Sequence, residues 1–315
     1  MIDYLIAILT FVAVGTLLGF ALNVQWGQAG MLNFGLPGFF GIGAYAAAIL
    51  SKHGVDGFTA TAAAVALTAA VSALVSFVTI GLREDCLAIS TVAFAEVVRL
   101  VLMNETWLTG GTNGIRDIPR PLLDVIGSNH YEAAFLAACL AIVAIVYGLL
   151  ELVLRAPFGR ALRAAREDDI VTATLGKNVQ VLRIKAFVIG GAVIGLAGAL
   201  HAFYFTYIDP GQFAGSVMIY ALMAVIIGGK GSNRGLLAGA CMVMMLLEGT
   251  RFLKEFIPIL GSQQAASLRL MLIGGGLLLT LILRPQGLVS EYRLSIREHA
   301  DPAAPPRREH RMDSA

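Results

Sequence analysis

The sequence predicts an all-α protein that crosses a membrane several times, and two observations support this. Hydrophobic residues make up 57% of the 315 residues and charged residues only 14%, with a mean hydropathy of +0.77. A soluble domain usually carries about 25% charged residues. The apolar residues also gather in long runs, as membrane helices of about 20 residues require. We therefore expect about 8–10 transmembrane helices, since helices satisfy their own backbone groups in lipid.

Nine apolar segments are candidate spans: residues 2–22, 35–50, 58–80, 86–103, 132–154, 184–208, 215–229, 235–253 and 267–283. The first carries Asp3 and no basic residue, which favours a membrane helix over a cleaved signal peptide. Two segments, 35–50 and 215–229, are short and lie beside glycines. Such segments are typical of discontinuous helices around a substrate path. A tilted helix is the alternative explanation.

The distribution of lysine and arginine predicts the orientation of the chain. If residues 155–183 lie in the cytoplasm, sixteen basic residues fall on that side and seven on the other. The segment 104–131 and the N-terminus are then external. We expect one transmembrane domain over residues 1–290, with a cytoplasmic loop at 155–185. Residues 291–315 are polar and predict a disordered tail.

One glycine-rich stretch, NVQWGQAGMLNFGLPGFFGIGAY at residues 23–45, interrupts the apolar sequence. A backbone break in lipid needs protein or water to satisfy its freed groups. The amide side chains here can donate and accept hydrogen bonds without carrying charge. We expect a break beside a translocation path, although a tight turn followed by close helix packing is equally compatible. The candidate path residues are Asn23, Gln28, Asn33, Gly35, Phe39, Gly43 and Tyr45.

The basic loop RAPFGRALRAAREDDIVTATLGKNVQVLRIK, residues 155–185, predicts a short helix over 158–170. Leu162, Ala165 and Ile170 would form its apolar strip, and Gly176 would end the helical region. The helix could dock a soluble partner or lie on lipid headgroups. The residues themselves favour neither interpretation.

Glycine pairs at four-residue spacing predict close helix contacts. The candidate packing glycines are Gly191, Gly195, Gly228, Gly229, Gly231, Gly235 and Gly239. The run GGKGSNRG lacks the pattern of a phosphate-binding loop, because Gly231 follows Lys230 where Ser or Thr is needed. The GxGxxA at 41–46 has no preceding strand and predicts no dinucleotide site.

The remaining polar residues predict structural roles. Glu96 with Arg99, and Glu248 with Arg251, have the spacing of self-neutralising pairs on one helix face, with a proton relay as the sharper alternative. His201 is expected to be a hydrogen-bonded packing residue. The three cysteines, Cys86, Cys139 and Cys241, are expected to be small buried hydrophobes. We expect no catalysis, no metal and no nucleic-acid partner.

The order of these motifs resembles the permease subunits of branched-chain amino acid ABC transporters of the LivM type. The first motif comprises Asn23, Gly27, Gly30, Asn33, Gly35, Phe39 and Gly43-Ala44-Tyr45. The second comprises Gly159–Arg163, Arg166-Glu167, Leu175-Gly176 and Lys185–Phe187. The GGKGSNRG run and Arg284–Leu288 follow in the expected order, so the resemblance covers about residues 5–289. The GAY ending favours amino acids over urea.

The resemblance implies an ABC importer permease with short or broken helices in the bacterial cytoplasmic (inner) membrane. It implies a homologous second permease of the LivH type, two separate ATPase subunits that hold ATP and Mg²⁺, and an external substrate-binding protein. This chain, surrounded by lipid, would itself bind no cofactor. The helix at 158–170 would be the coupling helix. The implied coupling residues are Gly159, Arg160, Arg163, Arg166, Glu167, Gly176 and Lys185. Urea, short amides or other small metabolites are alternative substrates, and ion-coupled secondary transport is an alternative mechanism.

Overall fold

A computed structural model describes residues 2–79, 81–121 and 130–256. It also describes the separate positions 123, 127, 271, 274–276, 278, 282 and 287–289. Within this part of the chain the regular elements are helices, and one antiparallel bridge joins Ile115 to Ile208. The predicted tail, 291–315, lies outside the described residues.

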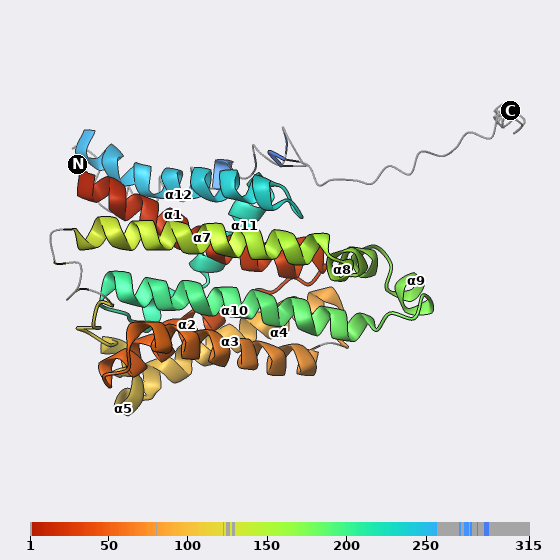
Figure 1. Ribbon diagram of the computed structural model, residues 1–315, viewed down its shortest axis with the longest axis horizontal. Helices are drawn as coiled ribbons and strands as arrows, with labels where there is room; N and C mark the ends of the chain where they lie inside the picture. Colours follow the sequence, from red (N-terminus) through yellow and green to blue (C-terminus); the bar gives the residue numbers. More distant parts are fainter. Residues whose placement is uncertain are drawn as a thin grey trace, which may run out of the picture.

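Eight apolar helices form a bundle in which most axes run along one direction (Figure 1). They are α1 (Ile2–Leu22), α2 (Leu36–Lys52), α3 (Gly57–Thr79), α4 (Glu84–Asn104), α7 (Tyr131–Arg155), α10 (Val179–Phe205), α11 (Ser216–Gly228) and α12 (Asn233–Phe256). Among the residues that the structure describes, five stretches are long and apolar enough to cross a membrane: Tyr4–Gln28, α3, α4, α7 and α10. The chain is therefore a multi-pass membrane protein.

The predicted spans agree closely with these helices. Both segments predicted to be short are so, because α2 has 17 residues and α11 has 13. α10 begins at Val179, five residues before the predicted start, where the Asn178 side chain accepts a hydrogen bond from the Val181 N–H. The ninth predicted span, 267–283, lies outside the described residues apart from a few positions.

The two ends of the bundle carry different short elements (Figure 1). At one end, the α5 end, lie the N-terminus, α5 (Thr106–Thr109) and the start of α7. At the other, the α8 end, lie α8 (Pro157–Glu167) and α9 (Asp169–Thr174). The N-terminus and the segment after α4 thus share one end, opposite the basic loop, as the distribution of charge predicts.

The centre of the bundle is built from α1, α2 and α10, which are far more buried than α3, α4 and α7. In the apolar window of α10, 72% of residues are buried, against 22% in α3 and in α4. Glycines let α10 approach its neighbours closely. A Cβ on Gly43 of α2 would lie 2.7 Å from the Gly195 Cα, and one on Gly195 would lie 2.7 Å from the Thr68 hydroxyl of α3.

Two predictions about local structure were wrong. The helix expected over 158–170 is divided at Asp168, whose extended backbone ends α8 and whose carboxylate caps α9 by accepting from Ile170 N and Val171 N. Ile170 consequently leaves the buried strip and is exposed, whereas Leu162 and Ala165 are buried. Cys86 is exposed in the first turn of α4, although Cys139 is buried as expected.

Candidate functional site

The candidate site is a backbone break at the α8 end of α1. Beyond Leu22 the helix widens into a π-helical segment, η1 (Asn23–Gln28), and α2 begins only at Leu36. Gly30 turns the chain with a φ of +73°, a conformation that favours glycine. Pro37 lies in the first turn of α2, where its missing N–H costs no helical hydrogen bond. The predicted break is therefore present.

The first part of the break is hydrogen-bonded to the turn between α11 and α12. The Asn23 amide donates to Asn233 Oδ1 at 2.8 Å, and its carbonyl oxygen accepts from the Gly231 N–H at 2.9 Å. Gln28 Nε2 donates to the Gly231 carbonyl at 2.5 Å. Asn23 is fully buried, so these bonds take the place of the hydrogen bonds that its side chain would make to water. They join residues that lie 208 positions apart in sequence.

The second part of the break is hydrogen-bonded to α10 and to itself. Gln25 Nε2 donates to the Phe187 carbonyl at 3.0 Å, and its Oε1 accepts from Asn33 Nδ2 at 2.9 Å. Asn33 Oδ1 then accepts from the Gly35 N–H at 2.8 Å. Among the freed backbone groups of the break these amides satisfy the Gly35 N–H, and their other bonds join the break to its neighbours. Their contact with a substrate stays a prediction.

The turn formed by the GGKGSNRG run packs against the break. Gly229 and Gly231 have φ values of +108° and +87°, which side-chain-bearing residues rarely adopt. This turn places Lys230 Nζ 4.6 Å from the centroid of the Trp26 ring, within cation–π range. The GGKGSNRG run, which does not have the pattern of a phosphate-binding loop, thus packs against η1.

α8 is attached to the same break by two arginines. Arg163 Nη1 donates to Gln28 Oε1 at 3.2 Å and to the Leu154 carbonyl at 3.3 Å. Arg166 donates to the Gly27 carbonyl and also pairs with Glu167 at 2.8 Å. These arginines therefore point into the bundle, which sequence spacing alone did not indicate.

The other predicted coupling residues lie differently. Gly159 is buried where α8 turns away from α7, and a Cβ there would collide with the Leu154 carbonyl. Arg160, Gly176 and Lys185 are exposed, as is Glu167. An ATPase contact at these positions stays a prediction.

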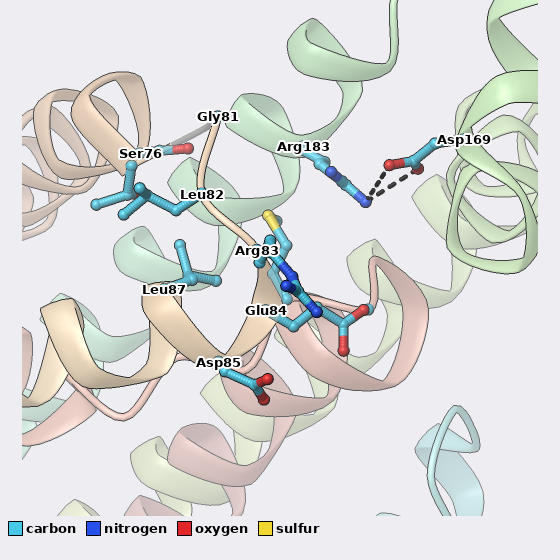
Figure 2. A pocket seen from close by; sticks show the side chains of 12 residues that line it. Ser76, Gly81, Leu82, Arg83, Glu84, Asp85, Leu87, Asp169 and Arg183 are labelled. Atoms are coloured by element: carbon cyan, nitrogen blue, oxygen red, sulfur yellow. Dashed lines mark hydrogen bonds and ion pairs between the residues drawn. The ribbon is translucent and has the colours of Figure 1, made fainter.

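A polar cavity of about 550 Å³ opens at the same end of the bundle (Figure 2). Its walls come from the segment after η1, the turn between α3 and α4, and the starts of α9 and α10. Figure 2 shows Arg183 and Asp169 pointing toward each other, and their nearest charged atoms are 2.8 Å apart. Arg83, Glu84 and Asp85 line it from the start of α4. Sequence reasoning missed this cavity because its lining residues lie far apart along the chain.

The candidate path residues do not gather in one place. Asn23, Gln28, Asn33 and Gly35 belong to the break, whereas Phe39, Gly43 and Tyr45 lie along α2. The Phe39 ring packs against Phe94 and Phe187, with centroids 4.8 and 5.9 Å apart. Tyr45 is buried beside Phe213, and among the described residues its hydroxyl has no hydrogen-bond partner. None of these seven lines the cavity of Figure 2.

Two further predictions concern polar groups within the spans. His201 Nε2 is 3.0 Å from Gln212 Oε1 and packs against aromatic rings, so its predicted packing role is confirmed. Glu96 and Arg99 form the predicted pair within α4. The side chains of the second predicted pair, Glu248 and Arg251, lie outside what the structure describes.

Comparison with known proteins places these features in a family. The model of the family "branched-chain amino acid transport system / permease component" matches residues 4–281. The high-affinity branched-chain amino acid transport permease LivM of Escherichia coli K12 is 32% identical over 93% of this chain and 71% of that protein. The LivH permease of the same strain is 28% identical over 72% and 78% of the two chains.

An archaeal protein is also similar. The probable LivM permease of Methanocaldococcus jannaschii is 28% identical over 92% of this chain and 94% of that protein. No solved structure matches the chain.

Proposed function

The chain belongs to the family of permease components of branched-chain amino acid transport systems, and we propose that it moves such amino acids inward, powered by ATP hydrolysis on separate ATPase subunits. Under this proposal it is the non-catalytic transmembrane subunit, seated in the bacterial cytoplasmic membrane with a second, homologous permease. An external binding protein delivers the substrate. The relatives described above carry the name of branched-chain amino acid transport, which favours these substrates over urea or short amides.

The attachment of α8 to the backbone break is the observation that carries the proposal. One side of α8 holds the break through Arg163 and Arg166, while Arg160 and Glu167 are exposed on the helix. A soluble subunit that presses on α8 would therefore act directly on η1. A lipid anchor would have no need of such bonds.

The neighbouring α9 extends the exposed surface with apolar side chains. Ile170, Val171 and Leu175 are all exposed beside the charged residues of α8. We call Arg160, Glu167, Ile170, Val171 and Leu175 the α8–α9 surface. Apolar residues rimmed by charge are typical of protein interaction sites. We expect an ATPase subunit to cover this surface.

Transport would follow from two states of the permease whose balance depends on nucleotide. Closure of the ATPase pair would shift α8, and the arginine bonds would pass that shift to η1. From η1 it reaches α10 through Gln25 and the α11–α12 turn through Asn23. This chain of contacts predicts that α8 is coupled to α10 and to the α11–α12 turn, and breaking the bonds one by one tests that prediction.

The test is reconstitution of the complete transporter in liposomes. The chain is co-expressed with a homologous second permease of the LivH type and two ABC ATPase subunits, and uptake of radiolabelled leucine is measured with the binding protein outside. We expect uptake that requires ATP and the binding protein and survives proton ionophores. Uptake by this chain alone down a proton gradient would show that the proposal is wrong.

A further inference from the structure

An ion pair lies on the outer face of α4, well inside the length of the helix. Glu96 and Arg99 bond to each other through Arg99 Nε at 2.9 Å and through a second, shorter contact. Their side chains are 52% and 26% exposed, respectively. The pair is therefore open to whatever surrounds the bundle.

The depth of the pair follows from helix geometry. α4 runs from Glu84 to Asn104, and a helix of its 21 residues is about 31 Å long. Glu96 lies about 18 Å from the first residue of α4 and about 12 Å from the last. The chain is polar just outside α4, with Arg83 before the helix and Glu105 after it, so Glu96 lies at the depth of lipid tails.

The rest of this face is apolar. Ile89, Val92, Val97, Leu100 and Val101 are all exposed, and they surround the pair along the helix. The opposite side of α4 packs mainly on α2, with Leu87, Thr91 and Leu102 buried. We call the exposed residues from Ile89 to Val101, including Glu96, the α4 face.

Lipid is a poor covering for such a face. Ionisable residues within membrane helices almost always point to a protein interior or a water-filled cavity, because hydrocarbon solvates charge badly. The internal pairing of Glu96 with Arg99 reduces that cost but leaves polar atoms uncovered.

The other peripheral helices differ. α3 contains no charged residue from Gly57 to Thr79, and its exposed side chains include Leu74 and Phe77. In α7 the charged residues lie near the ends, and its exposed middle carries Ile145 and Leu149. Those two faces suit lipid. Among the described peripheral helices α3, α4 and α7, α4 is the one with a charge pair in the middle of its exposed face.

We propose that the α4 face is the surface on which this chain meets the second permease, and that the Glu96–Arg99 pair contacts polar groups of a membrane helix of that partner. The inference rests on the proposed function. A soluble subunit could not reach this depth, so the partner must itself cross the membrane. LivM and LivH of one bacterial strain are both named as permeases of the same high-affinity system, and this chain resembles both.

The cavity of Figure 2 lies at the start of the same helix, where Arg83, Glu84 and Asp85 line it. This is the end of the bundle where α8 and α9 lie.

The experiment places a photo-activatable phenylalanine analogue at Val97 in the reconstituted four-subunit complex. Matched controls carry the same analogue at Leu74 of α3 and Ile145 of α7. These positions are 58%, 64% and 61% exposed, so the probes are equally accessible in this chain. Adducts are identified by mass spectrometry after illumination.

We expect the Val97 probe to give an adduct of this chain with the second permease and the two controls to give none. The inference alone is wrong if the complex takes up leucine while the adduct comes from Leu74 or Ile145, or if Val97 gives only lipid adducts. An adduct between two copies of this chain would also overturn it. If no second permease assembles with the chain, the inference and the proposed function are both wrong.

Discussion

Replacing Asn23 by leucine tests whether the hydrogen bonds of the break hold the protein together. Leucine has the branched outline of asparagine and is the larger side chain, so the change removes hydrogen bonds without opening a cavity. Leucine cannot donate to Asn233 Oδ1 or accept from the Gly231 N–H, which Asn23 reaches at 2.8 and 2.9 Å. Both partner groups then lose a buried hydrogen bond.

The magnitude follows from these two losses. A typical hydrogen bond contributes about 0.5–1.5 kcal/mol net, and a buried group left without a partner costs about 1–3 kcal/mol. Interhelical hydrogen bonds in membranes average about 0.6 kcal/mol, at the low end of that range. We therefore expect Asn23→Leu to lower the free energy of unfolding by about 2–4 kcal/mol.

Unfolding of the purified chain in mixed micelles with increasing SDS measures this free energy. The matched control is Asn104→Leu, which makes the same chemical change at an exposed asparagine bonded only to the Leu100 carbonyl of its own helix. We expect the control to change stability by less than about 0.5 kcal/mol. Equal effects of the two substitutions would refute the reasoning, because burial and long-range hydrogen bonds would then contribute nothing to the free energy of unfolding.

Three further predictions concern coupling, packing and charge. Arg166→Gln, which weakens the bond to the break, should reduce leucine uptake by the reconstituted complex more strongly than it reduces ATP hydrolysis. Arg155→Gln, at an exposed position where the side chain bonds to Glu151 of α7, should leave that ratio of uptake to hydrolysis unchanged. Gly195→Ala should destabilise the chain in thermal unfolding, because its Cβ would lie 2.7 Å from a threonine hydroxyl of α3. Gly148→Ala, in the open middle of α7, should stabilise it by about 0.5–1 kcal/mol. Glu96→Gln should retain ATP-dependent uptake in the presence of ionophores, and complete loss would favour the proton-relay interpretation.

The spans could be predicted because membrane helices depend on the composition of a local stretch of sequence. Runs of apolar residues and nearby glycines determine α2 and α11 as short helices without reference to any partner. The division of the basic loop could also have been predicted. Asp168 has the side chain preferred at helix N-caps, so the EDD sequence itself allows a second helix to begin there.

The partners of the break could not be predicted in this way. Asn23 and Asn233 are 210 residues apart, and nothing near either residue specifies the other. The inward direction of Arg163 and Arg166 depends in the same manner on where η1 lies. Composition identified amides able to satisfy a break, and only the packed bundle determines which groups they bond.

The glycine contacts of α10 have a mechanical consequence. Gly195 brings the backbone of α10 against the Gly43 backbone of α2 and against the short Thr68 side chain of α3, so no long, flexible side chain separates these helices. Sliding any of these three helices past another would require displaced backbone, whereas turning all three together requires none. We therefore expect α2, α3 and α10 to move together as one unit. The break at Asn23–Gln28 packs against this unit through α10, and α4 with its ion pair packs against it through α2.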